Sequence, residues 1–325
     1  MMKYSSKDLA IIIPTKDRPK QIYRHLMSLV DQNCELDRVI VVDSGKNIEE
    51  IVLSFKDRLP VEYYKSQPGQ VRQRNLGISM LNDTTNLVAW MDDDVTYYEN
   101  SINHMIKFWN LIDSKTVGVG FNMIYQSKNN FNIFKLISNK LNRPGSIKKS
   151  GQLTPFSNLT NDIEVQYLSG GATVWKYDII KKYKHDDNLL DLKWAACEDW
   201  IYSYPIGKKF KLMACASSKV QTEDEIRNNE RPINYYIDRG KIRYSMRLYF
   251  VLTNSELSRI LFFFSQLLFT IKLLSKLILY LDLKYLYEIH GTTKGILINL
   301  DVLFSIQHPN KLVKKLISKQ KDQKD

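Results

Sequence analysis

The sequence predicts an α/β fold: a doubly wound, largely parallel sheet followed by a helical C-terminal region. In the first half, short and almost continuously apolar runs alternate with segments whose apolar residues recur at helical spacing. Polar residues follow these runs directly, where strands would end. Beyond about residue 230 the chain changes to long helical segments, rich first in tyrosine and arginine and then in leucine and phenylalanine.

The strands and helices of this prediction can be placed in order along the chain. The predicted strands of the first half are "LAIIIP", which Pro14 ends, "VIVVD", "VEYYKS" and "NLVAWM". The predicted helices between them are "PKQIYRHLMSLVDQ", "NIEEIVLSFKD" and "GQVRQRNLGISMLN". Later strands are predicted at "TVGVGFNMIY", "VQYLSGGATVW" and "FKLMACASSKVQ".

The polar strand ends predict one binding crevice. Thr15 and Asp17 follow the first strand, Asp43 ends the second, and Asp92–Asp94 follow the fourth. In open α/β sheets, ligands bind outside the carboxyl ends of the strands. We therefore expect these side chains to converge at one edge of the sheet.

Size and charge limit the classes of protein and partner. The 325 residues are 44% hydrophobic, which is enough for one large domain with an appendage or for two domains. A formal net charge of +12 favours polyanionic partners, namely nucleic acid, phosphorylated small molecules or an anionic membrane. Much of this charge lies in "HPNKLVKKLISKQKDQKD", which favours a membrane-facing or disordered tail. No nucleic-acid-binding motif supports the first option.

The cysteines and the N-terminal residues indicate a cytoplasmic protein. Three cysteines without metal-site spacing are typical of reduced, buried thiols. The start, "MMKYSSKDLAIIIPTKDR", has no apolar segment followed by a cleavage site, so we expect no signal peptide.

The aspartate triplet Asp92–Asp94 is the strongest chemical signal. Adjacent like charges repel, and burying one unpaired costs several kcal/mol, so a cation is expected to offset them. Mg²⁺ or Mn²⁺ takes one or two carboxylates and completes its shell with phosphate and water. If the backbone stays extended, Asp92 and Asp94 point to one side and Asp93 to the other. The alternative interpretation is an exposed acidic turn.

A second acidic pair and two tryptophans lie together later in the chain. Glu198 and Asp199, at the start of a predicted helix, suit a general base, although acidic residues also favour helix N-termini. Trp194 and Trp200 flank this pair, and aromatic faces suit sugar rings, although tryptophans are more often core residues.

An arginine pair opens the third predicted helix of the first half. Arg72 and Arg74 follow Gly69, and guanidinium groups bind phosphates or nucleobase edges. A solvated helix face is the alternative, favoured more for Arg72 than for Arg74.

Six motifs in order resemble family 2 glycosyltransferases of the GT-A fold, over about residues 8–250. They are "IIIPTKDR", "VIVVDSG", "GQVRQRNLGI", "VAWMDDDV", "YLSGGATVWKYD" and "CEDWIYSYPIGKKFK". The resemblance implies a GT-A type doubly wound mixed sheet and inverting transfer of a sugar from a nucleotide sugar to an acceptor hydroxyl. It places a catalytic domain at 1–230, with a nucleotide-sugar half at about 8–116 and an acceptor half at about 117–230. Residues 231–325 form the helical, basic region.

The resemblance also implies roles for individual residues. It assigns nucleotide-sugar binding to Pro14, Thr15, Asp17, Asp43, Arg74, Asp92 and Asp93. It places a divalent cation, Mn²⁺ or Mg²⁺, on Asp94 and Asp92. It makes Asp199 the catalytic base with Glu198 as its neighbour, and puts Gly170, Gly171 and Trp200 on the acceptor side.

Three departures from the family pattern stand out. Where many relatives have a histidine after the late strand, this chain has Gln221, which puts metal ligation from that side in question. Pro205 replaces an arginine in the helix after the Glu-Asp pair. Gly240 replaces the asparagine of a tyrosine- and arginine-rich helix found in bacterial polysaccharide enzymes.

The leading functional prediction is a transferase that builds a bacterial surface glycan on a lipid-linked acceptor. A sugar-1-phosphate nucleotidyltransferase is an alternative, but "PTKDRPK" lacks the glycine-rich phosphate loop that such an enzyme wants. A non-catalytic carbohydrate-binding subunit is another, against which the intact Asp92, Asp94 and Asp199 argue.

The segment from Arg259 to Leu281 predicts membrane attachment. It has many large apolar residues, but Lys272 and Lys276 interrupt it, and each central lysine costs about 2.5–3.5 kcal/mol in a spanning helix. A helix lying in the membrane interface suits both groups of residues. We therefore expect a cytoplasmic protein, peripheral on the inner face of the bacterial plasma membrane. The alternative is a helical pair packed on the catalytic domain or forming a dimer.

Overall fold

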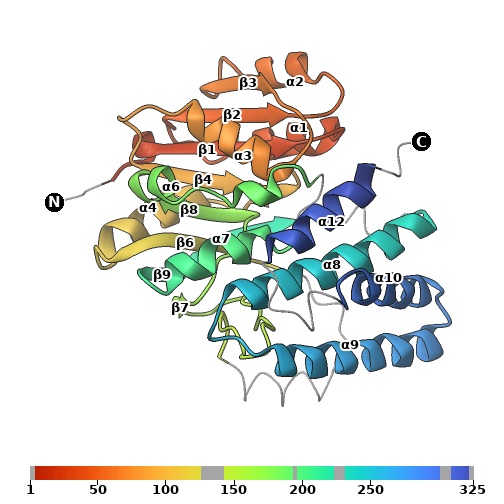
Figure 1. Cartoon of the computed structure of the whole chain (residues 1–325). Coiled ribbons are helices and arrows are strands. Elements are labelled where there is room, and N and C mark those ends of the chain that lie inside the picture. Colours follow the sequence, from red (N-terminus) through yellow and green to blue (C-terminus); the bar gives the residue numbers. More distant parts are fainter. Residues whose placement is uncertain (1–3, 126–142, 193–195, 223–230, 301–308, 322–325) are drawn as a thin grey trace. The chain divides into compact units, whose positions relative to one another are not determined.

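The computed structural model describes residues 4–125, 143–192, 196–222, 231–300 and 309–321 (Figure 1). The chain divides into two compact units. The sheet unit contains Met1–Ser146, Thr154–His185 and Tyr202–Asp224, and the helical unit contains Ile147–Leu153, Asp186–Ile201 and Glu225–Asp325. The predicted domain boundaries stay predictions.

Within the described residues, nine strands form one mixed sheet, in the order β3-β2-β1-β4-β8-β6-β9-β5, with β7 paired to β9. The strands β1, β2, β3 and β4 are parallel, and β8 runs antiparallel to both β4 and β6. Their bounds are β1 Leu9–Thr15, β2 Arg38–Asp43, β3 Val61–Lys65, β4 Leu87–Met91, β5 Val95–Tyr97, β6 Thr116–Met123, β7 Ile163–Val165, β8 Ala172–Lys176 and β9 Lys211–Thr222.

Helices cover both faces of the sheet, which is why the central strands β1 and β4 are buried along their whole length. Ile11 and Ile13 of β1 pack with side chains of α1, α2 and α4, whereas Ala10 and Ile12 pack with α3, α6 and the later part of α7. The helices are α1 Pro19–Val30, α2 Glu49–Leu53, α3 Gln70–Ser79, α4 Ser101–Leu111, α6 Tyr177–Lys182 and α7 Glu198–Gly207, with 3₁₀ turns η1 Ser6–Asp8 and η2 Asp187–Leu189.

The first strand does not end at Pro14, as predicted, but continues to Thr15. Pro14 pairs with Val42 of β2, whereas the pairing of β1 with β4 ends at Ile12. Because Pro14 lies beyond the last residue paired with β4, its missing N–H removes no hydrogen bond from that ladder.

The helical unit is built mainly from α8 Ile233–Thr253, α9 Arg259–Tyr280, α10 Lys284–Ile298 and α12 Asn310–Lys321. The predicted tail thus forms a helix over Asn310–Lys321. Helices α8 and α10 approach closely at two glycines. A Cβ on Gly240 would lie 2.3 Å from the carbonyl oxygen of Glu288, and one on Gly291 2.0 Å from that of Ile237. The helix packing therefore explains the glycine at position 240.

Candidate active site

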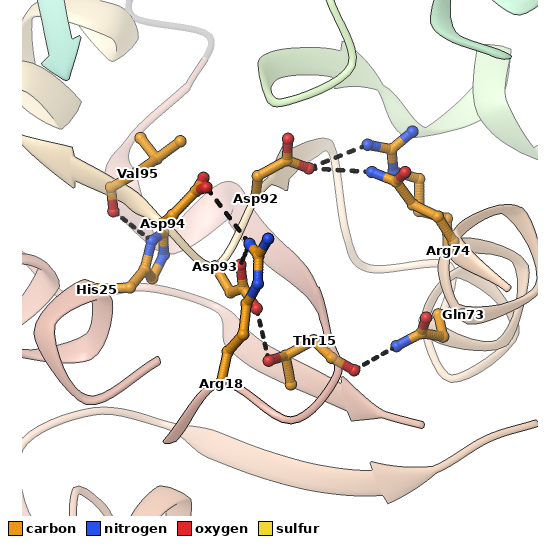
Figure 2. A network of polar contacts seen from close by, with 10 residues as sticks. Thr15, Arg18, His25, Gln73, Arg74, Asp92, Asp93, Asp94 and Val95 are labelled. Carbon is orange, nitrogen blue, oxygen red and sulfur yellow. Dashed lines mark hydrogen bonds and ion pairs between the residues drawn. The ribbon is translucent and has the colours of Figure 1, made fainter. Parts of the chain in front are cut away.

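The carboxyl ends of β1 and β4 bring the first predicted site residues together (Figure 2). Because these strands are parallel neighbours, Thr15 at the end of β1 lies beside Asp92–Asp94 after β4. The predicted convergence of the first and fourth strand ends is confirmed by the contact between Thr15 and Asp93.

The triplet itself does not continue the strand. β4 ends at Met91, and Asp93 and Asp94 lie in a turn before β5. The Val95 backbone N–H donates to the Asp92 carbonyl oxygen at 3.2 Å. The predicted alternation of the three carboxylates depends on an extended backbone, and this condition is not met after Met91. In Figure 2, Asp92 points toward Arg74, whereas Asp93 and Asp94 both reach Arg18.

Asp93 is the buried member, with 4% of its surface exposed. The Thr15 hydroxyl donates to its carboxylate at 2.6 Å, and the Arg18 guanidinium donates at 2.8 Å. Burial raises the pKa of Asp93 to about 6, while the charge of Arg18 opposes this rise. Asp93 thus anchors the turn to β1 and is held by its two partners.

Asp94 is more accessible and lies near two charges of opposite sign. Arg18 Nη1 is 3.3 Å from one of its carboxylate oxygens. Burial and the negative charge of Asp92 raise the pKa of Asp94, and Arg18 lowers it. Asp92 and Asp94 therefore lie close enough for their charges to interact.

Asp92 is held on the other side by α3. Arg74 Nη2 lies 3.3 Å from an Asp92 carboxylate oxygen, and the Gln70 amide donates to the same oxygen at 3.1 Å. Arg74 is 1% exposed, also donates to the Gly170 carbonyl at 2.9 Å, and lies over the Trp90 ring at 5.7 Å. A buried guanidinium with these contacts is fixed in orientation.

The two predicted acceptor-side glycines lie directly beside this network. The Asp92 backbone N–H donates to the Gly171 carbonyl at 2.8 Å. A Cβ on Gly171 would lie 2.6 Å from the Asp92 carboxylate, so a larger residue at this position would displace that carboxylate. A pocket of about 130 Å³ adjoins Gly171, with Tyr125, Phe156 and Tyr167 among its walls. Gly171 therefore contacts the carboxylate cluster and also lines an aromatic-walled pocket.

Asp43 is fully buried at the end of β2, and its carboxylate is satisfied within the chain. It accepts hydrogen bonds from the Tyr63 hydroxyl at 2.8 Å and from the Gly45 backbone N–H at 2.7 Å. Lys65 Nζ lies 2.5 Å away. Its predicted contact with a nucleobase stays a prediction. Asp17 lies nearby, since a Cβ on Gly45 would be 2.4 Å from its backbone nitrogen.

Sequence reasoning missed five polar residues of this edge: Arg18, Tyr63, Lys65, Gln70 and Gln73. Gln73 donates to the carbonyl oxygens of Thr15 and Val42, at 2.8 and 2.6 Å, and so ties α3 to the ends of β1 and β2. For Arg18, Lys65, Gln70 and Gln73 the available signal was their position, after or near the end of a predicted strand or in the first turn of the third predicted helix. Tyr63 lies in the middle of β3 and carried no such signal.

The predicted base pair begins α7 in the helical unit. Glu198 is buried, and the Trp200 backbone N–H donates to the Asp199 carboxylate at 3.0 Å. Cys197, just before the pair, has φ 71°, a conformation that non-glycine residues rarely adopt away from functional sites and turns. Burial, with a contribution from Asp199, raises the pKa of the Cys197 thiol. The Trp200 ring contacts Phe250 edge to face at 6.3 Å; Trp194 lies outside the described residues.

The carboxylates of Asp92 and Asp94 are the donor groups that the sequence predicts for a divalent cation. Among the described residues, no group of three or more His, Cys, Asp or Glu side chains could hold a metal. Gln221 lies on β9 beside Thr96 and accepts a hydrogen bond from the Tyr98 hydroxyl at 3.1 Å. Two interacting carboxylates fit Mg²⁺ or Mn²⁺, which takes its other ligands from phosphate and water.

Comparisons with known proteins agree with this architecture. The model of the family "Glycosyl transferase family 2" matches residues 10–183, more than half of the chain. An uncharacterized glycosyltransferase of Rickettsia typhi is 30% identical over 131 residues, which are 39% of this chain and 40% of that protein. One from Rickettsia conorii is 28% identical over 41% of this chain and 23% of its own. The chain therefore covers less than half the length of these relatives.

Two solved structures share the fold at low identity. The mannosyltransferase PcManGT from Pyrobaculum calidifontis, in complex with GDP-Man and Mn²⁺, has a TM-score of 0.54 and 11% identity, over 99% of this chain and 81% of its own. S. aureus TarS 1-349 with UDP-GlcNAc has a TM-score of 0.52 and 12% identity, over 97% and 91%. The predicted mixed α/β fold of GT-A type is confirmed, and the family match shows that this chain belongs to glycosyl transferase family 2.

Proposed function

We propose that this protein transfers a sugar, with inversion, from a nucleotide-diphosphate sugar to a hydroxyl group of a lipid-linked oligosaccharide in bacterial cell-surface polysaccharide synthesis. The observation that carries the proposal is the network at the ends of β1 and β4. There Arg18 and Arg74 hold three adjacent carboxylates in fixed directions. Such a preorganised carboxylate cluster, in a chain of this family, suits a divalent cation that would in turn bind the diphosphate of a donor.

The proposed donor site runs along the carboxyl ends of β2, β1 and β4. Asp43, Thr15 and Asp17 belong to its nucleoside side, and Arg74 to its diphosphate side. Arg74 supports this role because its guanidinium is buried and oriented by the Gly170 carbonyl. Since Asp43 is already bonded to Tyr63 and Lys65, these two residues belong to the proposed site as well.

Asp94 and Asp92 would hold a divalent cation, Mn²⁺ or Mg²⁺. When bound, the cation would offset the negative charge of the donor diphosphate. Arg18 already neutralises part of the triplet within the chain. Arg18 would therefore supply part of the positive charge of the cation if the enzyme worked without metal, so its dependence on metal has to be measured.

Asp199 is the proposed base. As the acceptor oxygen forms a bond to the anomeric carbon, the bond from that carbon to the diphosphate oxygen breaks, and the hydroxyl proton passes to the Asp199 carboxylate. The hydrogen bond from the Trp200 backbone supports this role, because it orients the carboxylate at the start of α7. The acceptor-side roles of Gly170, Gly171 and Trp200 are part of the same proposal.

Release of nucleoside diphosphate from a panel of nucleotide sugars tests the proposed reaction. Asp199→Asn should lower kcat about 10²–10⁴-fold, the usual contribution of a positioned base, with donor binding little changed. Asp57→Asn, on an exposed residue of the sheet unit, is the matched control and should keep full activity. EDTA and Asp94→Asn should each abolish turnover, and added Mn²⁺ or Mg²⁺ should restore the EDTA-treated enzyme.

Three results would contradict parts of the proposal. Release of pyrophosphate from nucleoside triphosphate and sugar phosphate would indicate a nucleotidyltransferase. A larger loss in Glu198→Gln than in Asp199→Asn would reverse the assignment within the pair. Full activity in EDTA would show that the arginines suffice without metal.

A further inference from the structure

Helix α9 exposes large apolar side chains of the kind that a soluble helix normally buries. The face that packs within the helical unit includes Phe262 and Leu273 but also the polar Gln266, which is 6% exposed. The outward face is apolar, and its large side chains are between 43% and 75% exposed. These exposed residues are Ile260, Leu261, Phe263, Phe264, Leu267, Leu268, Ile271, Leu274, Ile278 and Leu279.

A groove of about 630 Å³ continues this apolar surface within the helical unit. Phe263 and Leu267 of α9 form one wall, Ile296 of α10 contributes to the other, and Tyr244 of α8 lines it as well. The surface is therefore hollowed beside the helix. Exposed apolar patches of this extent mark interaction sites rather than ordinary solvent-facing surface.

The charges on α9 indicate what covers it. The helix has three basic residues, Arg259, Lys272 and Lys276, and no acidic residue. At 100° per residue, Lys272 falls on the flank of the exposed stripe. The Lys276 ammonium lies 5.5 Å from the ring of Tyr285. An apolar stripe with cations at its margin matches an anionic lipid surface, where the stripe enters the acyl region and the cations meet the phosphates.

We propose that the outward face of α9 docks on a bilayer containing anionic lipids, with the helix lying in the plane of the membrane interface. By length and composition α9 would also suffice to span a membrane. Its inner face argues for the in-plane arrangement. The Arg243 guanidinium lies 4.0 Å from the ring of Phe269 and 2.9 Å from Glu288, so a spanning α9 would draw this ion pair into the hydrocarbon.

A second copy of the chain fits this face less well. In a symmetric dimer the same patch meets itself, so the basic residues of two α9 helices, with no acidic partner on either, would be brought together. An anionic bilayer instead attracts both these residues and the overall charge of +12. This inference does not depend on the proposed reaction, because it uses the helical unit alone.

Flotation of the full-length protein with lipid vesicles tests the docking surface. We expect binding to phosphatidylglycerol–phosphatidylcholine vesicles, weakened by salt, and at least tenfold weaker binding to phosphatidylcholine alone. The triple variant Phe264→Ser, Leu268→Ser, Ile271→Ser should lose binding at least tenfold. The matched control is Leu111→Ser on α4, where the leucine is 75% exposed, and it should bind like the wild type.

A reporter on the helix keeps the test independent of the triple variant. Leu268→Trp should gain fluorescence that brominated lipids quench, whereas Leu111→Trp should show no added quenching. Two outcomes would overturn the proposal. One is full-length protein that stays unbound to anionic vesicles. The other is a dimer, seen by light scattering, that the triple variant converts to monomer while vesicle binding is unchanged.

Discussion

The sheet unit gathers buried, paired charges at its strand ends, whereas the helical unit, which also buries Lys241 and Glu288, exposes many large apolar side chains on one helix. In the sheet unit, Arg74 and Asp93 are almost fully buried, and each has oppositely charged and hydrogen-bonding partners within the same unit. In the helical unit, Leu268 and Ile278 of α9 are 67% and 75% exposed. Both arrangements are costly by the ordinary preferences of side chains.

The two units differ in what offsets the unfavourable free energy of each arrangement. Buried charges are satisfied inside the sheet unit, so their loss should appear as lost folding stability. The exposed face of α9 gains nothing from the chain, so its substitution should leave folding stability unchanged. Three predictions follow this contrast, in decreasing order of expected effect.

The largest effect concerns acid sensitivity through His185, a fully buried histidine of the sheet unit. Its ring packs against Trp90 and Tyr202, at 4.9 and 4.3 Å, and neither ring nitrogen has a hydrogen-bond partner among the described residues. Burial, with a smaller contribution from Arg74, lowers the pKa of His185 to about 3. In the unfolded chain the pKa is about 6.5, so the unfolded state binds more protons between these values.

Stability should therefore be intact above pH 6.5 and fall as the pH decreases toward 3. The loss from this group is about 1.4 kcal/mol per pH unit, or about 3 kcal/mol by pH 4. His185→Phe, which keeps an aromatic ring in place, should remove this part of the pH dependence. The raised pKa of Asp93 makes stability change with pH in the opposite direction, but this contribution is the same in both proteins and cancels in their difference. Denaturant unfolding at several pH values measures the free energy of unfolding of variant and wild type. If the two free energies changed with pH in parallel, the prediction would be wrong.

The second prediction concerns Arg74. Arg74→Met keeps most of the volume but removes the charged donor to the Gly170 carbonyl, and hydrogen bonds that involve a charged group contribute about 1.5–3 kcal/mol. The partner Asp92 adds less, because 37% of its side chain is exposed to water. Lys20→Met, at an exposed position of α1, is the control and should change the free energy of unfolding by less than about 0.5 kcal/mol. Equal effects of the two substitutions would show that the network contributes no stability.

Much of the sheet unit could be predicted from the sequence because its central strands are apolar on both faces and polar residues follow them directly. Thr15 and the aspartate triplet meet as their positions at strand ends predict. The contacts of Arg74 with Asp92 and with the Gly170 carbonyl were not predicted. The partners of Asp93 and Asp94 could not be predicted, because they depend on a turn that replaces the extended backbone after Met91. Arg18 reaches the triplet only through this turn.

For the helical unit, the sequence predicts the helices but not how they pack. The periodicity predicts α9 as a helix, but with apolar residues on most of its faces it does not tell which face is packed. That depends on α8 and α10, whose close approach at Gly240 and Gly291 needs atomic detail. The departure at position 240 therefore reflects packing between helices of this chain, which a comparison of motifs does not reveal.

The smallest effect is expected on the exposed face of α9. Ile278 is 75% exposed, so Ile278→Gln removes little buried apolar surface and keeps a residue compatible with a helix. The free energy of unfolding in vesicle-free solution should change by less than about 0.5 kcal/mol. Leu273→Gln, at a buried position of the same helix, is the matched comparison and should destabilise by several times as much, since it places an amide among apolar neighbours. If Ile278→Gln proved as costly as Leu273→Gln, the outward face of α9 would be covered within the folded protein. The contrast between the two units would then be lost.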